Sequence, residues 1–421
     1  MRQLFPLGRS ITGEGLRRSL RALGALAPVQ LTEVPTGTRV LDWEIPREWR
    51  VRSARLTGPG GEVIADYHRN NLHLVAYSAP FAGRLSLEAL QPHLHSLPDR
   101  PTWVPYRTTF YREDWGFCLA HADRERLRPG FYDVRIDADF FRGSMTLGEI
   151  VLPGARADEV LVSTHTCHPS LANDNLSGMV VAAALARALA GVPRGFTYRF
   201  VFVPAAIGAI AWLALNEGAV ARIRHGLVLA GLGDSGALHY KRSRRESAEI
   251  DRAAAQVLRH SGADHEIRPF DPVGYDERQY CSPGFDLAVG RLSRTPGNRW
   301  PPYHSSGDTP DVMVPEQLGD AVRRCLEIFE VLEGNRAYLN LSPKGEPQLG
   351  RRGVFDARAW PSQSDAALQA ALWVLNQSDG AHSLLDIAER SGLPFPAVRS
   401  AAEALEAAGL LREIELQGGK P

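Results

Sequence analysis

The sequence predicts an α/β protein with an inserted β-rich domain and a C-terminal winged helix-turn-helix. Between residues 159 and 232, continuous apolar runs alternate with helical segments, which is typical of a sheet covered by helices on both faces. Residues 36–98 alternate apolar and polar side chains between Gly and Pro, which indicates short strands. After residue 345 the pattern is helix, turn, helix and a short strand, as in a winged helix.

The core elements follow one another in a simple order. A helix is expected in GEGLRRSLRALGAL, and strands are expected in EVLVST, TYRFVFVPA and GLVLAGLG. Helices are expected in SGMVVAAALARALAG and IGAIAWLALNEG, between and after these strands. We therefore expect a core of residues 1–35 and 99–342, an inserted domain at 36–98 and a winged-helix domain at 345–421. The segment 128–150 continues the β pattern and is an alternative part of the insertion.

Composition excludes several classes of function. The 421 residues contain 48 Lys and Arg and 48 Asp and Glu, so neither a nucleic-acid surface nor a polybasic membrane surface is expected. The segment PFPAVRSAAEALEAAG, the expected recognition helix, has one Arg and two Glu, which also argues against DNA binding. No apolar run is long enough to span a bilayer, and the start of the chain lacks an apolar leader region. The four cysteines form no CxxC pair, so we expect a cytoplasmic protein with free thiols.

The stretch STHTCHPSLANDNLSG, residues 163–178, is the first candidate site. His165 directly follows a predicted strand, where ligands bind in open α/β sheets, and Asp174 lies in the turn before a helix. Imidazole and carboxylate together suit zinc, although Asp174 could instead cap the helix while His165 satisfies a buried backbone group. His168 is a weaker ligand candidate or a hydrogen-bond donor to a ligand. Cys167 is a candidate nucleophile or a support for the site.

A second set of candidates lies far along the chain. His304 lies in the loop PPYHSSGDTPD, where Asp308 is expected to orient it; the alternative is an exposed loop histidine. Asp234 follows the third predicted strand, where a further carboxylate ligand would stand.

Two polar segments are candidates for substrate contacts. The basic run between residues 241 and 245 offers a carboxylate- or phosphate-binding edge, or else a solvated surface. The acidic pair in GYDERQYCSPGFDL offers recognition of a substrate ammonium group, or else a surface ion pair. The candidate substrate contacts are Lys241, Arg244, Asp276, Glu277, Arg278, Tyr280 and Tyr303.

The motifs together resemble a known family. The order of strand, HxC, NDN, helix, strand, PxxIG, helix and a late YHxxxDT is similar to that of the co-catalytic zinc aminopeptidases of the M28 type. More closely, the chain resembles the bacterial aminopeptidase-like proteins of the DUF2172 and DUF4910 families, from residue 4 to about 412. The motifs that carry this resemblance are LFPLGRSITGEG, NNLHLVAYSAPF, WGFC, THTCHPSLANDNLSG, DERQYCSPG and YHSSGD.

The resemblance implies an M28-like α/β/α core with an inserted β domain, a winged helix and one zinc ion, with a pair of ions as the alternative. By motif position, His165 matches the first zinc-ligand histidine, Asp174 the bridging aspartate and His304 the late histidine, whereas Asp234 matches a further ligand loosely. M28 enzymes have an Asp where Cys167 stands here, and the neighbouring His168 would stand in for its support.

The chain departs from the family at FVFVPAAIGAIAW. The resemblance implies a Glu after this strand, as the general base that takes a proton from the attacking water, but Ala205 and Ala206 stand there. Alanine accepts no proton, and the loss of a positioned base costs about 10² to 10⁴ in rate. Because the surrounding PxxIG is intact, we favour an inactivating substitution at Ala205, such as one made to trap a ligand, over a natural pseudoenzyme.

Three functions follow as hypotheses. The first is a zinc-dependent amide or peptide hydrolase of the aminopeptidase type, acting on a small peptide or aminoacyl conjugate and impaired by Ala205. The second is a pseudoenzyme that binds a peptide-like ligand as a sensor or scaffold, with the winged helix serving a protein contact such as homo-oligomerisation. The third is an acyl-transfer or cyclising zinc enzyme.

Overall fold

The computed structural model describes residues 1–296, 299–352, 354 and 365–415. The chain forms two compact units, residues 1–246 with 266–322 (unit 1) and residues 247–265 with 323–421 (unit 2). In the described part of the chain, no helix has the length and apolar character needed to cross a bilayer.

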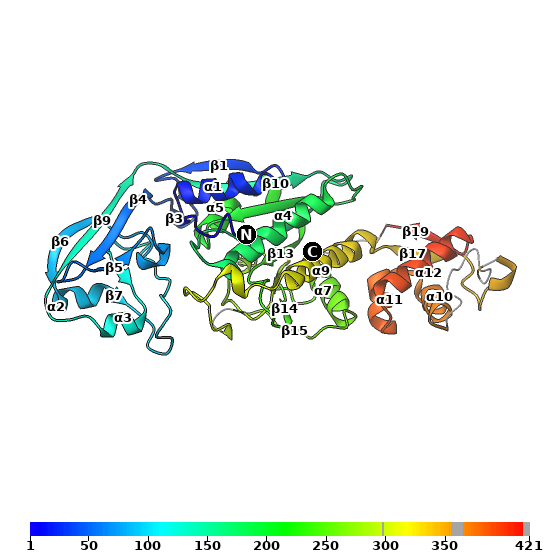
Figure 1. The fold of residues 1–421 in the computed structure, drawn as a ribbon. Helices are drawn as coiled ribbons and strands as arrows, with labels where there is room; N and C mark the ends of the chain where they lie inside the picture. Colours follow the sequence, from blue (N-terminus) through cyan, green and yellow to red (C-terminus); the bar gives the residue numbers. More distant parts are fainter. Residues whose placement is uncertain (297–298, 353, 355–364, 416–421) are drawn as a thin grey trace. The chain divides into compact units, whose positions relative to one another are not determined.

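Unit 1 is built on an eight-stranded mixed sheet (Figure 1). Its strand order is β1 (Gln30–Pro35), β10 (Ser144–Leu152), β12 (Thr197–Val203), β11 (Glu159–His165), β13 (Ile223–Leu229), β16 (Val289–Ser293), β14 (Leu238–Lys241) and β15 (His265–Arg268). The four strands β12, β11, β13 and β16 are parallel, whereas β1 and β10 run antiparallel at one side and β14 pairs antiparallel with β16. The three predicted core strands are therefore confirmed as the parallel centre of the sheet.

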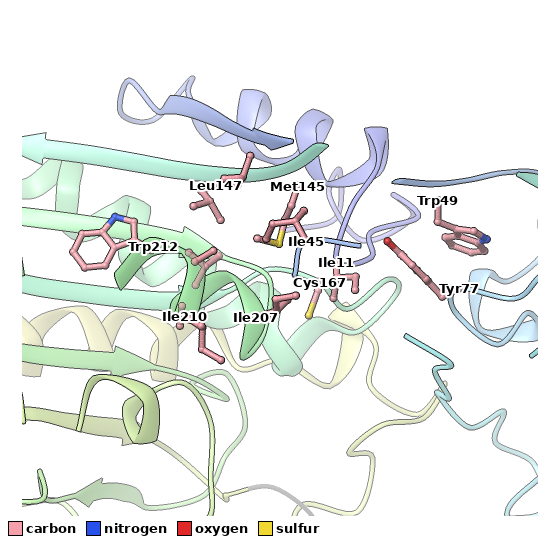
Figure 2. Packing of buried hydrophobic residues seen from close by; sticks show 14 of the residues in the cluster. Ile11, Ile45, Trp49, Tyr77, Met145, Leu147, Cys167, Ile207, Ile210 and Trp212 are labelled. Carbon is pink, nitrogen blue, oxygen red and sulfur yellow. The ribbon is translucent and has the colours of Figure 1, made fainter. Parts of the chain in front are cut away.

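Helices cover this sheet because both of its faces are apolar. Every residue of β11 is buried. Leu161 of β11 and Val201 of β12 belong to one continuous apolar cluster, in which Figure 2 labels Ile207 and Trp212. Outside residues 36–141, the helices that the structure describes in unit 1 are α1 (Glu14–Leu23), α4 (Gly178–Leu189), α5 (Ile207–Leu215), α6 (Glu217–Val220) and α8 (Glu277–Tyr280), with the short helices η3 (Ala172–Ser177) and η5 (Pro310–Val312). The predicted helices at the start of the chain and after the first two strands are confirmed.

A second, antiparallel sheet contains four strands, in the order β5 (Val63–Asp66), β4 (Glu48–Thr57), β9 (Phe131–Phe141) and β6 (Phe81–Ser86). Strand β9 alternates exposed and buried side chains, as a sheet with one solvated face requires. The chain leaves β9 directly for β10 of the large sheet, so the segment 128–150 is divided between the two sheets. Shorter elements of this region are β2 (Arg39–Val40), β3 (Trp43–Glu44), η1 (Asn71–His73), α2 (Leu87–Leu90), η2 (Gln91–His93), β7 (Leu94–His95), β8 (Phe117–Cys118) and α3 (His121–Glu125).

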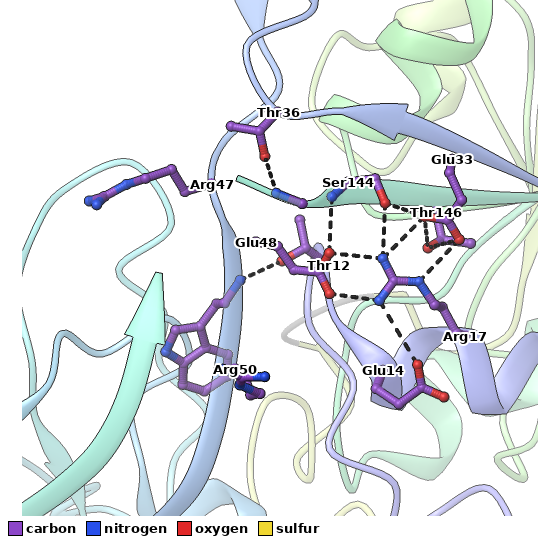
Figure 3. Close-up of polar contacts among 12 residues, drawn as sticks. Thr12, Glu14, Arg17, Glu33, Thr36, Arg47, Glu48, Arg50, Ser144 and Thr146 are labelled. Atoms are coloured by element: carbon purple, nitrogen blue, oxygen red, sulfur yellow. Dashed lines mark hydrogen bonds and ion pairs between the residues drawn. The ribbon is translucent and has the colours of Figure 1, made fainter. Parts of the chain in front are cut away.

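One arginine fastens α1 to both sheets (Figure 3). The largely buried Arg17 guanidinium pairs with Glu33 on β1 at 3.0 Å and with Glu48 on β4 at 2.6 Å. Its Nη2 also donates to Ser144 at the start of β10. The hydrogen bonds that Arg17 donates to Glu48 more than offset the cost of burial and raise the pKa of Arg17. Arg17 thereby ties α1 to strands of both sheets.

Unit 2 has the elements of a winged helix. Its three-stranded sheet has the order β18 (Asp379–Ser383), β17 (Ala337–Asn340) and β19 (Leu411–Ile414). The helices described in this unit are α7 (Glu249–Arg259), η6 (Leu349–Arg352), α10 (Asp365–Gln377), α11 (Leu384–Ser391) and α12 (Phe395–Ala407). Helix α9 (Pro315–Gly334) leads from unit 1 into unit 2. The expected order of helices is confirmed for α10 to α12, and Ser383 begins α11 with a capping box. Of the predicted domain at 345–421, residues 353, 355–364 and 416–421 lie outside the described residues.

Candidate metal centre

The histidine and aspartate of the first candidate site meet in the folded chain. His165 ends β11 and Asp174 lies in η3, and both side chains are almost fully buried. Nε2 of His165 lies 2.7 Å from Oδ1 of Asp174. His168 completes a group of three whose ligand atoms all lie within 4.8 Å of one another. This is the arrangement expected at the carboxyl edge of a parallel sheet.

His304, 130 residues further along the chain, reaches the same aspartate. Its Nε2 lies 2.9 Å from Oδ2 of Asp174. Among the described residues, however, neither of these two buried atoms has a hydrogen-bond partner. An imidazole nitrogen and a carboxylate oxygen that face each other in this way are two ligand atoms that one cation could share. The donor set of two imidazoles and one carboxylate thus fits Zn²⁺, with His168 as a further imidazole beside it.

The charge states of Asp174 and His168 agree with this fit. Burial would raise the pKa of Asp174, but the neighbouring His168 and the hydrogen bond from His165 hold that pKa well below its usual range. Burial lowers the pKa of His168 to about 3, so this imidazole is neutral at physiological pH. An ionised carboxylate beside a neutral imidazole is the protonation state that a divalent cation needs.

The backbone around Asp174 is positioned by residues whose roles differ from those expected. Asn175, not Asp174, accepts the N–H of Gly178 at the start of α4, so the helix-capping interpretation of Asp174 does not hold. Asp308 accepts the backbone N–H groups of Asn173 and Asp174 at 2.6 and 3.0 Å. It therefore holds the segment that carries Asp174, instead of orienting His304 as we expected, because its carboxylate is already occupied by backbone donors.

Cys167 supports the neighbouring turn and is not activated as a nucleophile. Its Sγ accepts the N–H of Ala205 at 3.2 Å, and it packs with Ile11, Ile45 and Ile207 (Figure 2). Burial raises the pKa of the thiol to about 12. A thiol that stays protonated at neutral pH is a poor nucleophile.

The backbone at the two alanines is strained. Ala206 has φ 54° and ψ −69°, and the N–H of Ile207 donates to the carbonyl of Ala205 at 2.8 Å. This is a classic γ-turn, which is rare and unfavourable for an L-residue. It is held from both sides, because Asp276 accepts the N–H of Ala206 at 2.8 Å while Cys167 accepts that of Ala205. Strain of this kind persists where the surrounding structure maintains a functional geometry.

Asp234 does not join the metal candidates. Its Oδ1 accepts hydrogen bonds from Thr295 and Gly236, and its Oδ2 accepts one from Asn173. The hydrogen bonds of the two oxygens therefore connect the loop of Asp234 with the loop of Thr295 and with η3. Asp234, the expected further carboxylate ligand, therefore has a structural role, because hydrogen-bond donors occupy both of its oxygens.

Glu277 and Lys241 form a buried ion pair and not a substrate contact. Nζ of Lys241 lies 2.7 Å from Oε1 of Glu277, and Nη1 of Arg291 lies 3.1 Å from the same oxygen. Glu277 is fully buried and Lys241 is 1% exposed. One member of the predicted basic run, Lys241, and one of the predicted acidic pair, Glu277, thus satisfy each other inside the fold.

Replacing Glu277 by Gln should lower the free energy of unfolding by about 3–5 kcal/mol, because two buried cations would lose their counter-charge. Equilibrium denaturation in urea measures this effect. Replacing the neighbouring, exposed Arg278 by Ala should change stability by less than about 0.5 kcal/mol. Equal effects of the two changes would contradict the buried-pair interpretation.

Of the remaining substrate candidates, Tyr303 contacts one of the candidate metal ligands, whereas Tyr280 and Arg244 have other partners. Tyr280 is fully buried and its hydroxyl lies 2.8 Å from Ser163, and Arg244 pairs with Asp286 at the surface; neither approaches the cluster in these contacts. Tyr303 stacks on His304 with 3.9 Å between ring centroids. Tyr275, which the sequence did not single out, stacks on His165 at 5.1 Å. Two tyrosines therefore cover two of the candidate ligands.

Comparisons with known proteins agree with this geometry. A family model described as Domain of unknown function (DUF4910) matches residues 1–335, and one described as winged helix-turn-helix matches residues 336–413. A Clostridium acetobutylicum protein, provisionally named as a polysaccharide biosynthesis protein with an aminopeptidase-like domain, is 41% identical over 412 residues, covering 98% of this chain and 95% of the relative.

Solved structures share the fold. The crystal structure of a provisionally named peptidase from Clostridium acetobutylicum has a TM-score of 0.93 at 41% identity, covering 98% of this chain and 94% of that one. A zinc aminopeptidase from Bacillus subtilis has a TM-score of 0.57 at 13% identity over 79% of this chain and 93% of that one. A peptidase M28 precursor from Shewanella amazonensis has a TM-score of 0.54 at 12% identity over 79% and 91%. These likenesses confirm the expected fold class.

Proposed function

The chain belongs to the DUF4910 family and has the fold of the M28 aminopeptidases, and we propose on this basis that it is a zinc-dependent amide hydrolase of the aminopeptidase type. The observation that carries the proposal is the meeting of the buried His165 and Asp174 with the half-buried His304, where two facing ligand atoms have no hydrogen-bond partner among the described residues. Peptidase-type relatives support a hydrolase at the level of the family.

In the proposed reaction each side chain has a defined part. His165, Asp174 and His304 would hold one Zn²⁺, which when bound polarises a scissile carbonyl and lowers the pKa of water towards about 7. Residue 205 lies at the turn where the general base is expected, and Ala205 leaves that position without a proton acceptor. We therefore expect this chain to bind its substrate and to hydrolyse it slowly.

The substrate class proposed is a small peptide or aminoacyl conjugate. Because the Clostridium acetobutylicum relative is associated by name with polysaccharide biosynthesis, aminoacylated amino sugars belong among the compounds to be tested. The test is to measure the zinc content of the purified chain and to assay its Ala205→Glu form on aminoacyl and peptidyl amides with and without zinc. Zinc-dependent turnover supports the hydrolase, and its absence throughout such a panel contradicts it.

A sensor or scaffold is the second candidate, and the missing base favours it. With Ala205 at the turn, a pocket that binds without turnover would serve to detect a peptide-like ligand. Equal substrate binding by metal-free and zinc-loaded chain would favour this role over the hydrolase, because the proposed reaction needs the carbonyl at the metal.

The winged helix is proposed to contact protein, not DNA. On α12 the exposed Glu403 and Glu406 face solvent, and Glu403 pairs with Arg399. An acidic recognition helix repels phosphates. We therefore expect the full chain to pass through immobilised duplex DNA at about 0.1 M salt without retention. Retention that is lost on raising the salt concentration would reverse this assignment.

A further inference from the structure

Arg9, in the N-terminal motif LFPLGRSITGEG, is a buried cation without an acidic partner. Its side chain is 1% exposed. Nε donates to the carbonyl of His168 at 2.9 Å and Nη1 donates to the carbonyl of Leu4. Among the described residues, Nη2 has no hydrogen-bond partner and no carboxylate pairs with the guanidinium. Burial lowers the pKa of Arg9 to about 10, so the group remains charged at neutral pH.

A second unpartnered donor lies beside it. The hydroxyl of Tyr106 is buried and, within the part of the chain that the structure describes, makes no hydrogen bond. The Tyr106 ring contacts His168 and His304 edge-on, with centroids 5.0 and 5.3 Å apart. Burial raises the pKa of Tyr106 well above its usual value, and the nearby Arg9 opposes that rise. The phenol is therefore a neutral donor within electrostatic reach of the guanidinium.

The charge of the site favours an anion at this place. Zn²⁺ held by His165, Asp174 and His304 would leave a net positive charge, to which Arg9 adds another. Asp276 and Asp308 accept backbone N–H groups of Ala206, Asn173 and Asp174, and within the described residues neither carboxylate pairs with Arg9. A buried cation is normally paired with an anion, and unpartnered buried donors indicate a missing acceptor.

We propose that Arg9 and Tyr106 form a carboxylate-binding subsite beside the metal candidates, and that it takes the free carboxylate of a dipeptide or N-acyl amino acid. Consecutive Cα atoms are about 3.8 Å apart, so a carboxylate one residue beyond the scissile amide would reach donors that border His168 and His304. A guanidinium with a phenol hydroxyl is well suited to a carboxylate. This inference rests on the proposed hydrolase and specifies its substrate as a short, acid-terminated one.

The test compares alanylalanine with alanylalanine amide by isothermal titration calorimetry on the full, zinc-loaded chain. Ala205 keeps turnover slow, so binding is measured directly. We expect the free acid to bind about 10- to 100-fold more tightly than the amide, the range for one or two hydrogen bonds to a charged group. Arg9→Met should bring this ratio close to one, Arg9→Lys should retain part of it, and Tyr106→Phe should reduce it less. Acetate should compete with the acid and not with the amide.

Arg199→Met is the matched control, since Arg199 is also buried but is paired with Glu149 and Glu159 on the large sheet; it should leave the ratio unchanged. Melting temperature and zinc content verify the fold of each variant. The proposal is overturned if folded Arg9→Met keeps the acid-to-amide ratio, or weakens both ligands equally. If Arg9→Met does not fold, Tyr106→Phe and Arg9→Lys decide in the same way. Repeating the titration without zinc distinguishes failure of the subsite from failure of the hydrolase. A chain that binds no zinc but still prefers alanylalanine to its amide would refute the hydrolase and leave the carboxylate-binding subsite standing.

Discussion

Replacing Ala205 by Glu should raise kcat/KM for amide hydrolysis by roughly 10²- to 10⁴-fold, the usual contribution of a positioned base. The reason is that the turn which would aim this side chain is still present. The γ-turn at Ala206 is held by Asp276 and Cys167 through backbone N–H groups, and these contacts do not depend on the side chain of residue 205. The rate should be measured on aminoacyl amides at saturating zinc, as a function of pH.

Ala205→Gln is the control for this gain. Glutamine has almost the same size and reach as glutamate but accepts no proton at neutral pH. We expect the Gln form to bind substrate like the Glu form and to remain as slow as the Ala form. The rate of the Glu form should fall as its carboxylate becomes protonated at low pH. Equal rates for the Glu and Gln forms would show that position 205 does not supply a base.

Replacing Asp174 by Asn should reduce bound zinc from about one equivalent to almost none. Changes to groups that merely orient ligands typically lower metal affinity about 10- to 100-fold. A larger loss is expected for Asp174, because it is a proposed ligand and faces both His165 and His304 directly. The amide keeps the shape of the side chain but removes the negative charge. Equilibrium dialysis against zinc, followed by elemental analysis, measures the affinity.

Asp234→Asn provides a matched comparison. Asp234 is also a buried aspartate after a strand of the same sheet, but its oxygens accept hydrogen bonds from Thr295, Gly236 and Asn173. We expect this variant to retain its zinc while losing some stability. If zinc is lost from the Asp234 variant and kept by the Asp174 variant, the assignment of the metal centre is wrong.

Local sequence patterns were sufficient for much of the fold. The parallel strands of the core were visible because buried strands are continuous apolar runs, and α11 and α12 were visible from apolar spacing. His165 could be recognised because a strand end places its side chain at the ligand-binding edge. The late His304 had no local signal beyond its loop, and only its match to the family motif connected it with Asp174.

The failures concern charged side chains whose partners are distant in sequence. Lys241 and Glu277 lie in charged segments that the sequence predicts to be exposed and to bind a ligand, yet the two side chains are paired in the interior. Asn175 and Tyr275 carried no distinct signal, because a capping amide and a loop tyrosine are common. Their importance follows from what lies next to them in space.

The sequence by itself determined the family, the order of strands and helices, the candidate residues for a zinc site and the presence of Ala at position 205. These properties follow from local periodicity, from motif spacing and from the identity of single side chains. Only the tertiary structure decided that Asp174 faces His304, that Asp234 and Glu277 are committed elsewhere, and that Arg9 is buried without a counter-charge. The physical reason is that burial and charge pairing depend on which distant segments fold together, and charged side chains have the same appearance in sequence whether they face water or one another.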